Sequence, residues 1–439
     1  MSKLESLNLK KKISNKKSII GIIGLGYVGL PLAIRFSEVG YKVIGFDIDN
    51  KKLKYLNSGK SFISHINDKK IKFLKRKRFL ATKDYSKISE VDIIVVCVPT
   101  PIKNNKKPDL KFIYSSLRET KQYLRSGQLL VLESTTYPGT TEEIIVPFVK
   151  SLNFQIGKNF FVSYSPERED PGNTKFKTKN TPKVIAGYTQ NCTTMSKILY
   201  DKIVDKTVIV SSPKVAEFTK LMENIHRAVN IGIVNEMKIV AKKMNININE
   251  VINAASTKPF GFTPYQPGPG VGGHCIPVDP YYLSWKAKKE GVSTKLLDTA
   301  NKLNGKMPYY TYKETIKLLN KEKKNYSDMS VLIVGMAYKK NINDTRESPG
   351  LEILSLLLKK KIRVNYSDPY IPKISLNVGK KKFTFKSLDL SATNLKKHDL
   401  TLIITAHDIF NYKKIIDNSK LLVDTRFVLK KYNNRIISI

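Results

Sequence analysis

The sequence predicts an α/β protein in which two doubly wound domains are joined by a long helix and a central helical domain. Three observations support this prediction. Short apolar runs alternate with helical stretches up to about residue 210, a long helical stretch follows, and the alternation resumes at Ser330. A chain of 439 residues is too long for one compact core. We expect a basic N-terminal tail at 1–17, a first doubly wound domain at 18–212, a central helical domain at 213–320 and a second doubly wound domain at 321–439.

The first domain is predicted from six short apolar runs that suit the buried strands of a mostly parallel sheet. These runs are Ile19–Gly24, Lys42–Asp47, Asp92–Val98, Leu129–Glu133, Phe160–Ser165 and Lys206–Val210.

A glycine fingerprint for a dinucleotide follows the first run. Gly24 permits a tight turn, Gly26 lets the backbone approach a pyrophosphate, and Gly29 allows close packing of the next helix. Asp47 ends the second run, where a carboxylate accepts ribose hydroxyls and repels a 2′-phosphate. The pattern therefore predicts a Rossmann-like domain that binds NAD rather than NADP. The residues assigned to the fingerprint are Gly24, Gly26, Tyr27, Val28 and Gly29.

Polar residues follow three further strands, at the edge where doubly wound sheets bind ligands. Thr140 and Glu143 have the spacing of a capping box, so the threonine-rich run near Thr135 also has a structural explanation. Glu167 is either a solvated loop residue or a base held near a cysteine. The residues assigned to this edge are Pro99, Thr100, Ser134, Thr135, Glu167 and Arg168.

A long helix is predicted from Lys214 to about Lys243, with apolar residues at helical spacing. Lys220 and Asn224 lie four residues apart on one face of it, where an ammonium and an amide could together stabilise a developing oxyanion. Taken alone, such a pair is more often a surface pair. Its meaning depends on the other candidate residues.

Cys275 lies in a run of glycine and proline at 267–280, with Asp279 four residues later. A cysteine on a backbone that can approach a ligand closely indicates a nucleophile. The alternative is a small buried hydrophobic residue, which is our expectation for Cys97 and Cys192. We assign His274 no role. The three cysteines lack the spacing of metal ligands, so no metal site is expected.

The formal net charge of +40 raises the question of a nucleic-acid partner. Only 11 of the 77 basic residues are arginine, and the lysines are spread over the whole chain. This distribution favours solvated surfaces, so we expect no nucleic-acid binding, although an anionic substrate would benefit from the field. No apolar stretch reaches the length of a membrane span, and no secretory signal is recognisable. A cytoplasmic protein without membrane insertion is expected.

Several motifs occurring in this order resemble the nucleotide-sugar 6-dehydrogenases, the UDP-glucose/UDP-mannuronate dehydrogenase family. The resemblance runs from about residue 18 to the C-terminus. Two segments, 165–172 and 268–279, are more similar to members acting on UDP-N-acetylhexosamines, UDP-N-acetylglucosamine in particular. The motifs that carry the resemblance are Gly24–Gly29, Ser134-Thr135, Pro166-Glu167, Lys220-X-X-X-Asn224, Gly272-Gly-His-Cys275, Asp279 and the segment from Tyr338-Lys339 to Arg346.

The resemblance implies a four-electron oxidation in which the sugar C6 hydroxymethyl becomes a carboxylate and two NAD are reduced. It implies that Lys220 and Asp279 hold a water, that Cys275 adds to the aldehyde, and that Lys220 and Asn224 hold the resulting oxyanion. Glu167, with Thr135 near the attacking water, would then assist hydrolysis of a thioester. The product would enter surface polysaccharide synthesis, as in O-antigen or capsule.

The resemblance also implies a UDP-binding C-terminal domain and at least a homodimer. Arg346 matches a residue that reaches NAD, and Lys258 lies near the place of a cation supplied by a neighbouring subunit. The residues implied in substrate binding are Glu167, Arg168, Lys220, Asn224, Lys258, Tyr265, Gly272, Tyr338, Lys339 and Arg426. Two alternatives stay open. One is the same chemistry on UDP-N-acetylgalactosamine, UDP-N-acetylmannosamine or UDP-glucose, and the other is a non-catalytic nucleotide-binding or nucleic-acid-binding protein.

Overall fold

The computed structural model of the chain describes residues 2–63, 66–103, 105–168, 173, 175–322, 325–429 and 433–439. The chain folds into two compact units. Unit 1 comprises Met1–Glu223 and Tyr281–Ser293, and unit 2 comprises Asn224–Pro280 and Thr294–Ile439. The residues expected to form a separate central domain are therefore divided between the two units. Helix α8 (Pro213–Lys243) contributes to both, and its bounds agree with the predicted long helix.

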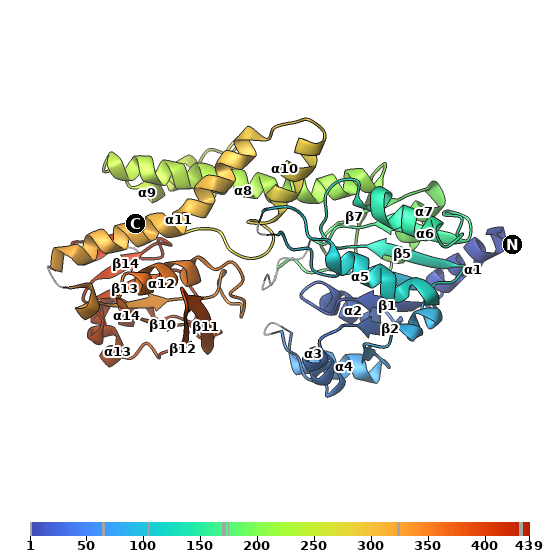
Figure 1. Ribbon diagram of the computed structural model, residues 1–439, viewed down its shortest axis with the longest axis horizontal. Coiled ribbons are helices and arrows are strands. Elements are labelled where there is room, and N and C mark those ends of the chain that lie inside the picture. Colours follow the sequence, from blue (N-terminus) through green and yellow to red (C-terminus); the bar gives the residue numbers. More distant parts are fainter. Residues whose placement is uncertain are drawn as a thin grey trace. The chain divides into compact units, whose positions relative to one another are not determined.

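Unit 1 is built on an eight-stranded sheet with the order β3-β2-β1-β4-β5-β6-β7-β8 (Figure 1). All neighbouring strands are parallel except β6 and β7. The chain order reverses between β1 and β4, so the loops after these strands flank the usual ligand crevice of such a sheet. Two strands without a counterpart among the predicted runs, β3 and β7, complete the sheet. The strands are β1 (Ile19–Ile23), β2 (Lys42–Phe46), β3 (Leu80–Thr82), β4 (Ile93–Val96), β5 (Gln128–Leu132), β6 (Phe160–Tyr164), β7 (Lys183–Gly187) and β8 (Thr207–Ile209).

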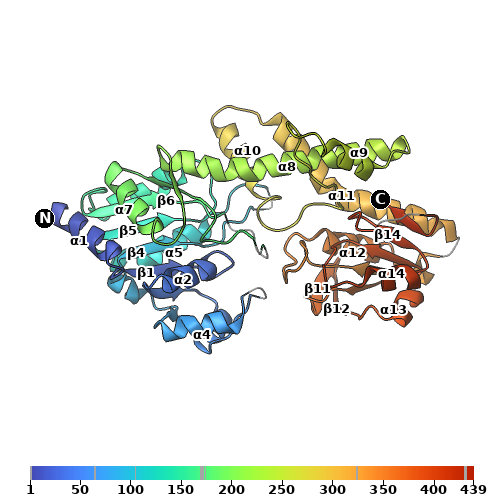
Figure 2. The same cartoon turned by 180° about the vertical axis from the view of Figure 1, so that it is seen from behind.

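Helices lie on both sides of this sheet (Figures 1 and 2). One side is covered by an apolar cluster to which helices α1, α2 and α7 contribute. The helices that precede α8 are α1 (Ser2–Ser14), α2 (Gly29–Glu38), α3 (Asn50–Asn57), α4 (Asp68–Arg76), α5 (Lys111–Thr120), α6 (Val146–Lys150) and α7 (Gln190–Tyr200).

Residues 1–17, expected to form a basic tail, instead contain helix α1. Leu9 and Ile13 lie one turn apart on this helix and are 2% and 0% exposed. Both belong to the apolar cluster of unit 1. Lys12 Nζ donates to Asp92 Oδ1 at 2.8 Å. Two apolar residues at helical spacing are thus sufficient to bury one face of the helix, although lysines surround them in the sequence. The lysine side chains on such a helix can stay in water.

Unit 2 contains a second doubly wound sheet, which confirms the predicted fold class. Its five strands are parallel, in the order β10-β9-β13-β14-β15, and a separate hairpin of β11 and β12 accompanies them. The strands are β9 (Ser330–Val334), β10 (Arg363–Ser367), β11 (Lys373–Val378), β12 (Lys381–Lys386), β13 (Leu400–Ile403), β14 (Leu422–Asp424) and β15 (Ile436–Ser438). The helices that follow α8 are α9 (Ile248–Ala255), α10 (Asp279–Lys289), α11 (Lys295–Leu319), α12 (Pro349–Lys359), α13 (Ala392–Lys397) and α14 (Tyr412–Asn418).

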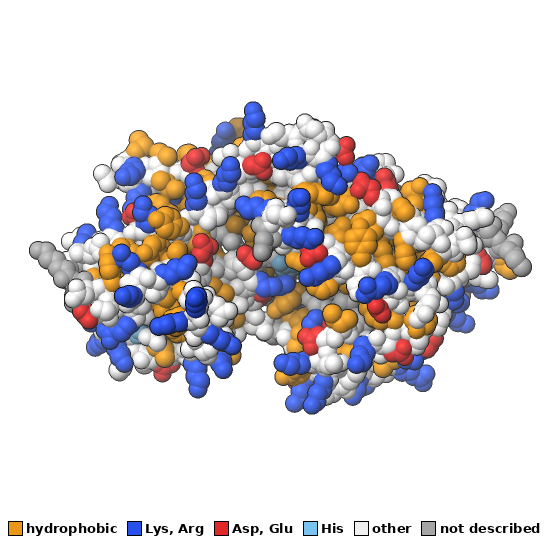
Figure 3. All heavy atoms as spheres, in the orientation of Figure 1, with side chains coloured by type: hydrophobic (Ala, Val, Ile, Leu, Met, Phe, Trp, Pro, Cys, Tyr) orange, Lys and Arg blue, Asp and Glu red, His pale blue; other side chains and the backbone are white. Residues whose placement is uncertain are grey.

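Lysine and arginine side chains are scattered over the face drawn in Figure 3, with apolar areas between them. They form no continuous stripe on this face. Within the part of the chain that the structure describes, no helix combines the length and apolarity needed to cross a bilayer. Within the same part, no cluster of histidine, cysteine and acidic residues is suited to holding a metal ion.

Candidate active site

The glycine fingerprint of unit 1 forms the turn between β1 and α2. Gly24 has a φ of +94°, and a Cβ atom there would lie 2.6 Å from the carbonyl oxygen of Cys97. A Cβ at Gly29 would lie 1.9 Å from the carbonyl oxygen of Gly24. A Cβ at Gly26 would meet no atom within 4 Å. Gly24 and Gly29 are therefore needed for the turn itself, whereas Gly26 leaves its backbone open to a ligand.

Asp47 follows β2 and is held beside this turn. The backbone N–H of Leu25 donates to Asp47 Oδ2 at 2.9 Å, and that of Asp49 donates to Oδ1 at 2.9 Å. Lys52 Nζ donates to Oδ2 at 3.0 Å. The carboxylate is thus fixed at the position where it can accept ribose hydroxyls. Glycines that admit a pyrophosphate and a fixed acid at the second strand together fit NAD.

The ends of β4 and β5 are tied together beside the fingerprint. Ser134 Oγ donates to the carbonyl oxygen of Val98 at 2.8 Å, and Thr135 follows it, half-buried. Tyr282 Oη donates to the carbonyl oxygen of Thr100 at 3.0 Å, and Pro99 beside it is exposed. The strand-end residues therefore lie on the predicted edge of the sheet.

The predicted capping box at Thr140 is wrong. Thr140 Oγ1 donates to the carbonyl oxygen of Tyr137 at 2.7 Å and makes no cap. A capping-box hydroxyl at Thr140 would accept from the N–H of Glu143, but that N–H donates to the carbonyl oxygen of Gly139 at 2.8 Å. The neighbouring amides are satisfied by a buried glutamate of α8, 76 to 78 residues away: Glu217 accepts from the N–H groups of Gly139 and Thr141 at 2.5 and 2.8 Å.

Glu167 lies in a buried cluster that the sequence analysis did not predict. Lys183 Nζ lies 3.3 Å from Glu167 Oε2 and 2.7 Å from Glu133 Oε2. Tyr200 Oη donates to the other oxygen of Glu133. The side chains of Lys183 and Glu133 are 4% and 0% exposed. One ammonium group is thus shared by two carboxylates, of which Glu167 is the more exposed.

The charges of this cluster depend on one another. Burial raises the pKa of Glu133, and the charge of Glu167 raises it further, against the opposing effect of Lys183. Burial alone would lower the pKa of Lys183, but the two carboxylates outweigh it and raise that pKa above its usual value. Lys183 therefore stays charged at physiological pH and holds Glu167 in place.

In unit 2, the cysteine loop is joined to helix α8. Asn224 Nδ2 donates to Asp279 Oδ2 at 2.5 Å, and Asp279 is 3% exposed. The carbonyl oxygen of the half-buried Cys275 accepts from the N–H of Asp279 at 2.8 Å. Asn224 and the segment from Cys275 to Asp279 therefore form one connected group. Lys220 lies one turn before Asn224 on the same helix, in the part of α8 that belongs to unit 1.

The glycines before the cysteine are required by close packing. A Cβ at Gly272 would lie 2.6 Å from Tyr338 Cβ and 2.7 Å from the carbonyl oxygen of Glu347. The N–H of Gly273, which has a φ of +81°, donates to the carbonyl oxygen of Arg346 at 2.9 Å. The cysteine loop thus rests on the segment from Tyr338 to Glu347, which also contains the half-buried Lys339.

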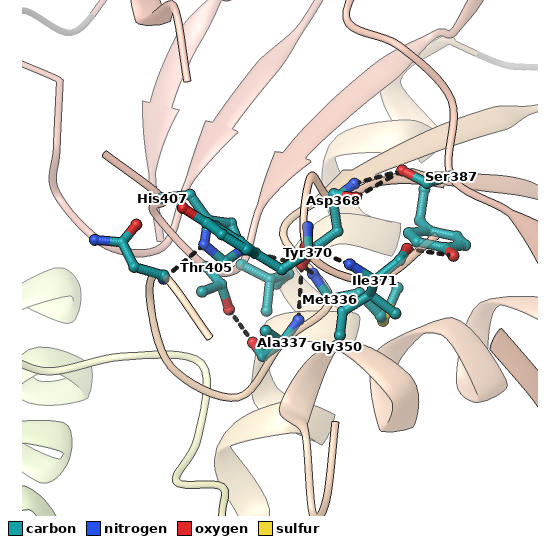
Figure 4. A network of polar contacts seen from close by, with 12 residues as sticks. Met336, Ala337, Gly350, Asp368, Tyr370, Ile371, Ser387, Thr405 and His407 are labelled. Atoms are coloured by element: carbon teal, nitrogen blue, oxygen red, sulfur yellow. Dashed lines mark hydrogen bonds and ion pairs between the residues drawn. The ribbon is translucent and has the colours of Figure 1, made fainter. Parts of the chain in front are cut away.

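A second acid, Asp368, follows β10 in unit 2 as Asp47 follows β2 in unit 1. Its Oδ2 accepts from the N–H groups of Met336 and Ala337 at 2.6 and 2.9 Å, and its Oδ1 accepts from that of Tyr370 at 2.8 Å (Figure 4). His407 Nε2 lies 3.0 Å from Oδ2. Since His407 Nδ1 accepts from a backbone N–H, its Nε2 carries the proton and donates to Asp368.

These contacts enclose Asp368, which is 2% exposed. Hydrogen bonds from His407 and backbone amides lower the pKa of this carboxyl despite its burial. The carboxylate is occupied by protein donors, so Asp368 does not repeat the ribose contact predicted for Asp47. The absence of a full glycine fingerprint in this unit is consistent with that difference.

The remaining predicted residues have the following surroundings. Arg168 Nε donates to Glu223 Oε1 at 2.9 Å, and Arg346 Nε donates to Asp344 Oδ2 at 2.9 Å. Tyr265 Oη lies 3.1 Å from His226 Nδ1. Their roles in binding stay predictions.

Two further candidates differ in exposure. Lys258 is exposed, and its Nζ lies 4.9 Å from the centre of the Phe260 ring. Arg426 Nε donates to the carbonyl oxygen of Ile404 at 2.7 Å, and the residue is partly buried. Of the segment 165–172, which the sequence analysis compared with the family, residues 169–172 lie outside the described residues.

Sequence reasoning missed Glu133, Lys183 and Lys238, all of which are buried. Glu133 was noted only as the end of a strand. A weak signal existed for Lys183, because it opens an apolar run directly after a proline. No sequence pattern marked Lys238, a lysine among many on a long helix.

Comparison with known proteins agrees with this arrangement. Three models of the UDP-glucose/GDP-mannose dehydrogenase family match the chain: its NAD binding domain at residues 18–204, its central domain at 214–306 and its UDP binding domain at 332–431. A UDP-N-acetyl-D-glucosamine 6-dehydrogenase from Salmonella typhi is 32% identical over 418 residues, covering 93% of this chain and 96% of the relative.

Other relatives have a different sugar in their names. A UDP-N-acetyl-D-mannosamine dehydrogenase from Methanocaldococcus jannaschii is 32% identical over 436 residues, covering 98% of this chain and 96% of that protein. The solved structure of a UDP-D-ManNAc dehydrogenase from Pyrococcus horikoshii has a TM-score of 0.84 at 29% identity, covering 96% of this chain and 98% of that one. The chain therefore belongs to the UDP-glucose/GDP-mannose dehydrogenase family and is an NAD-dependent oxidoreductase that acts on a nucleotide sugar.

Proposed function

We propose that this protein oxidises C6 of UDP-N-acetyl-D-glucosamine to a carboxylate and so supplies a uronic acid for surface polysaccharide. The observation that carries the proposal is the link between the cysteine loop and α8. Asn224 contacts Asp279, whose own N–H is bonded to the carbonyl oxygen of Cys275. An amide bonded to a carboxylate, which lies one helical turn after a half-buried cysteine, suits the covalent capture of an aldehyde.

When bound, NAD would accept the hydride. In the proposed reaction the hydroxymethyl group loses a hydride and a proton and becomes an aldehyde. The Cys275 thiolate adds to the aldehyde carbon, and Asn224 with Lys220 holds the negative charge on the oxygen. Loss of a second hydride leaves a thioester on the cysteine. The reactive aldehyde thus stays attached to the protein between the two oxidations.

Hydrolysis of the thioester needs a base, and Glu167 is the proposed one, with Thr135 near the attacking water. Glu167 would take a proton from the water, which attacks the carbonyl carbon and releases the cysteine and the uronate. Lys183 supports this role because it fixes one oxygen of Glu167 through the contact of 3.3 Å.

The alternative substrate with specific support is UDP-N-acetyl-D-mannosamine, because several relatives carry that name at 30–34% identity. UDP-N-acetylgalactosamine and UDP-glucose remain further alternatives within the same chemistry.

Turnover of a panel of these four UDP-sugars, with NADH counted per sugar consumed, tests the proposal. We expect two NADH per UDP-N-acetylglucosamine, and a kcat/KM for it at least about tenfold above the others, since one well-placed polar contact provides such discrimination. A higher kcat/KM for the mannosamine epimer would transfer the proposal to that sugar. One NADH per sugar would contradict the covalent route.

We further propose that the protein is a homodimer whose subunits meet along α8. Large apolar side chains of this helix are exposed at helical spacing, which is the composition of an interface rather than of a solvated surface. The exposed residues are Val215, Phe218, Met222, Ile233, Met237 and Val240, between 41% and 55% exposed.

Replacement of Met237 by glutamate should convert the dimer to a monomer at micromolar concentration, because it places a charge within an apolar interface. Light scattering coupled to gel filtration measures the mass. The control is Val292→Glu, at an exposed apolar residue outside α8, which should leave the mass unchanged. A wild-type protein with the mass of one chain would contradict the proposed dimer.

A further inference from the structure

Lys238 is a buried lysine in the part of α8 that belongs to unit 2. The residue is 2% exposed, and its Nζ has no hydrogen-bond partner within the described part of the chain. Taking a polar group out of water without a hydrogen-bond partner is unfavourable, and it is more so if the group is charged. A lysine kept there needs a compensating role.

The surroundings of Lys238 are apolar rings and charged groups. Its Nζ lies 6.0 Å from the centre of the Tyr310 ring and 5.6 Å from that of Phe427. The charged groups that act on it are the cations Arg426 and Lys242 and the carboxylates Asp424 and Glu314.

Lys242 Nζ donates to Glu314 Oε2 at 2.5 Å, so these two neutralise each other. The carboxylate of Asp424 accepts from the N–H groups of Arg426 and Leu429 at 2.9 and 3.0 Å. With Lys238 charged, three cations face two carboxylates. Burial, followed by the charges of Arg426 and Lys242, lowers the pKa of Lys238 to about 7. The group is thus one negative charge short of balance.

The guanidinium of Arg426 also has hydrogen-bond donors that no described residue uses. Its Nε donates to the carbonyl oxygen of Ile404, but neither Nη group donates to any other described residue. A Cβ at Gly268 would lie 2.6 Å from Nη1, so the glycine-rich loop lies directly against the guanidinium. The N–H of Gly268 donates to Asn235 Oδ1 at 2.9 Å, and Asn235 lies one turn before Lys238. The loop, Arg426 and Lys238 therefore converge.

We propose that Lys238 and Arg426 form one anion site that takes the diphosphate of the nucleotide sugar, with Lys238 as its second cation. The inference rests on the proposed function, since that function supplies the diphosphate. The Arg426 fork donates to phosphate oxygens, and the flexible stem of Lys238 turns the amine from the two rings toward the same anion. The diphosphate supplies the missing negative charge.

A consequence is that binding takes up a proton. In the free protein above about pH 7 Lys238 is largely neutral, because its pKa is lowered to about 7. Next to a diphosphate the charged form is favoured, so at pH 8 one proton enters with the ligand. At pH 6 the amine is already protonated, and the uptake disappears. Affinity for the diphosphate therefore falls as pH rises above about 7.

Calorimetric titration of the full-length protein with UDP, in two buffers of different ionisation enthalpy, measures this proton. Wild type should take up close to one proton more than K238M at pH 8. At pH 6 this difference should disappear, because Lys238 is then already protonated and the terminal phosphate of UDP, which itself titrates at about pH 6, contributes equally to both proteins. K238M should bind UDP at least about tenfold more weakly, without the uptake, because a charged contact is lost. K238R should keep the affinity and lose the uptake, because arginine stays protonated. Uridine, which lacks phosphate, should bind wild type and K238M equally.

The control is K243M, at an exposed lysine of the same helix, and it should behave as wild type. Met fits the stem of Lys238 between the rings, so K238M should melt no lower than wild type, and K238R provides an independent test. Wild-type affinity and proton uptake in K238M would overturn the site. If pyrophosphate bound as tightly as UDP, the site would be one for a free anion rather than for the diphosphate of a nucleotide. UDP binding requires no turnover, so these outcomes are separate from a failure of the UDP-sugar panel.

Discussion

Replacing Cys275 by alanine is expected to lower the rate of uronate formation at least about a thousandfold, because no other group of the connected site can form the thioester. The first oxidation needs no thiol, so a slow release of aldehyde with one NADH per sugar should remain. A carbonyl-trapping amine and mass spectrometry identify that aldehyde. NADH counted per sugar consumed gives the stoichiometry.

The matched control is Cys192→Ala, at a fully buried cysteine in α7. It should retain two NADH per sugar, since this thiol belongs to the apolar cluster of unit 1. Uronate formation by the Cys275 variant at the wild-type rate would refute the covalent route. It would leave the family assignment untouched.

Replacing Lys183 by methionine is expected to lower the free energy of unfolding by about 3–5 kcal/mol, because it leaves two buried carboxylates without their shared cation. Without Lys183, burial and the charge of Glu167 should hold the folded-state pKa of Glu133 above that of the unfolded chain. Stability is then fully present below the unfolded pKa and is lost as pH rises through the folded pKa. The loss should therefore be larger at pH 8 than at pH 5, in urea unfolding followed by circular dichroism.

Lys179→Met is the matched control, since Lys179 is 62% exposed and lies 4.0 Å from Asp205. Its loss should change stability by less than about 0.5–1 kcal/mol. Adding Glu133→Gln to Lys183→Met should recover part of the stability, because one buried charge is removed. Equal losses for the Lys183 and Lys179 variants would contradict the cluster as described.

Local patterns were sufficient for much of the fold and for part of the site. The turn at Gly24 and the position of Asp47 could be predicted because both belong to one βαβ unit with a known glycine and acid spacing. The bounds of α8 could be predicted from the spacing of its apolar residues. The link between Asn224 and the cysteine loop could be anticipated only through the family resemblance, because nothing local relates residues 55 positions apart.

The residues that were missed share one physical cause. Lys183 and Lys238 are buried, whereas a lysine in a chain with this many lysines is taken to be on the surface. Glu133 and Lys183 are separated by 50 residues and meet only because β6 and β7 pair antiparallel beside β5. Helix α1 was missed because its two buried residues, Leu9 and Ile13, are next to lysines in the sequence. In each case tertiary pairing, rather than local sequence, determines the environment.

The two acids that follow the second strand of each sheet have a consequence for engineering. Asp47 is held by two amides and one lysine, and remains able to accept from a ligand, whereas Asp368 fastens several loops of its own unit. A substitution intended to change the preference between NAD and NADP can therefore be confined to Asp47. Asp368, by contrast, supports the fold of unit 2. Its replacement should lower the melting temperature and should not change the preference between NAD and NADP.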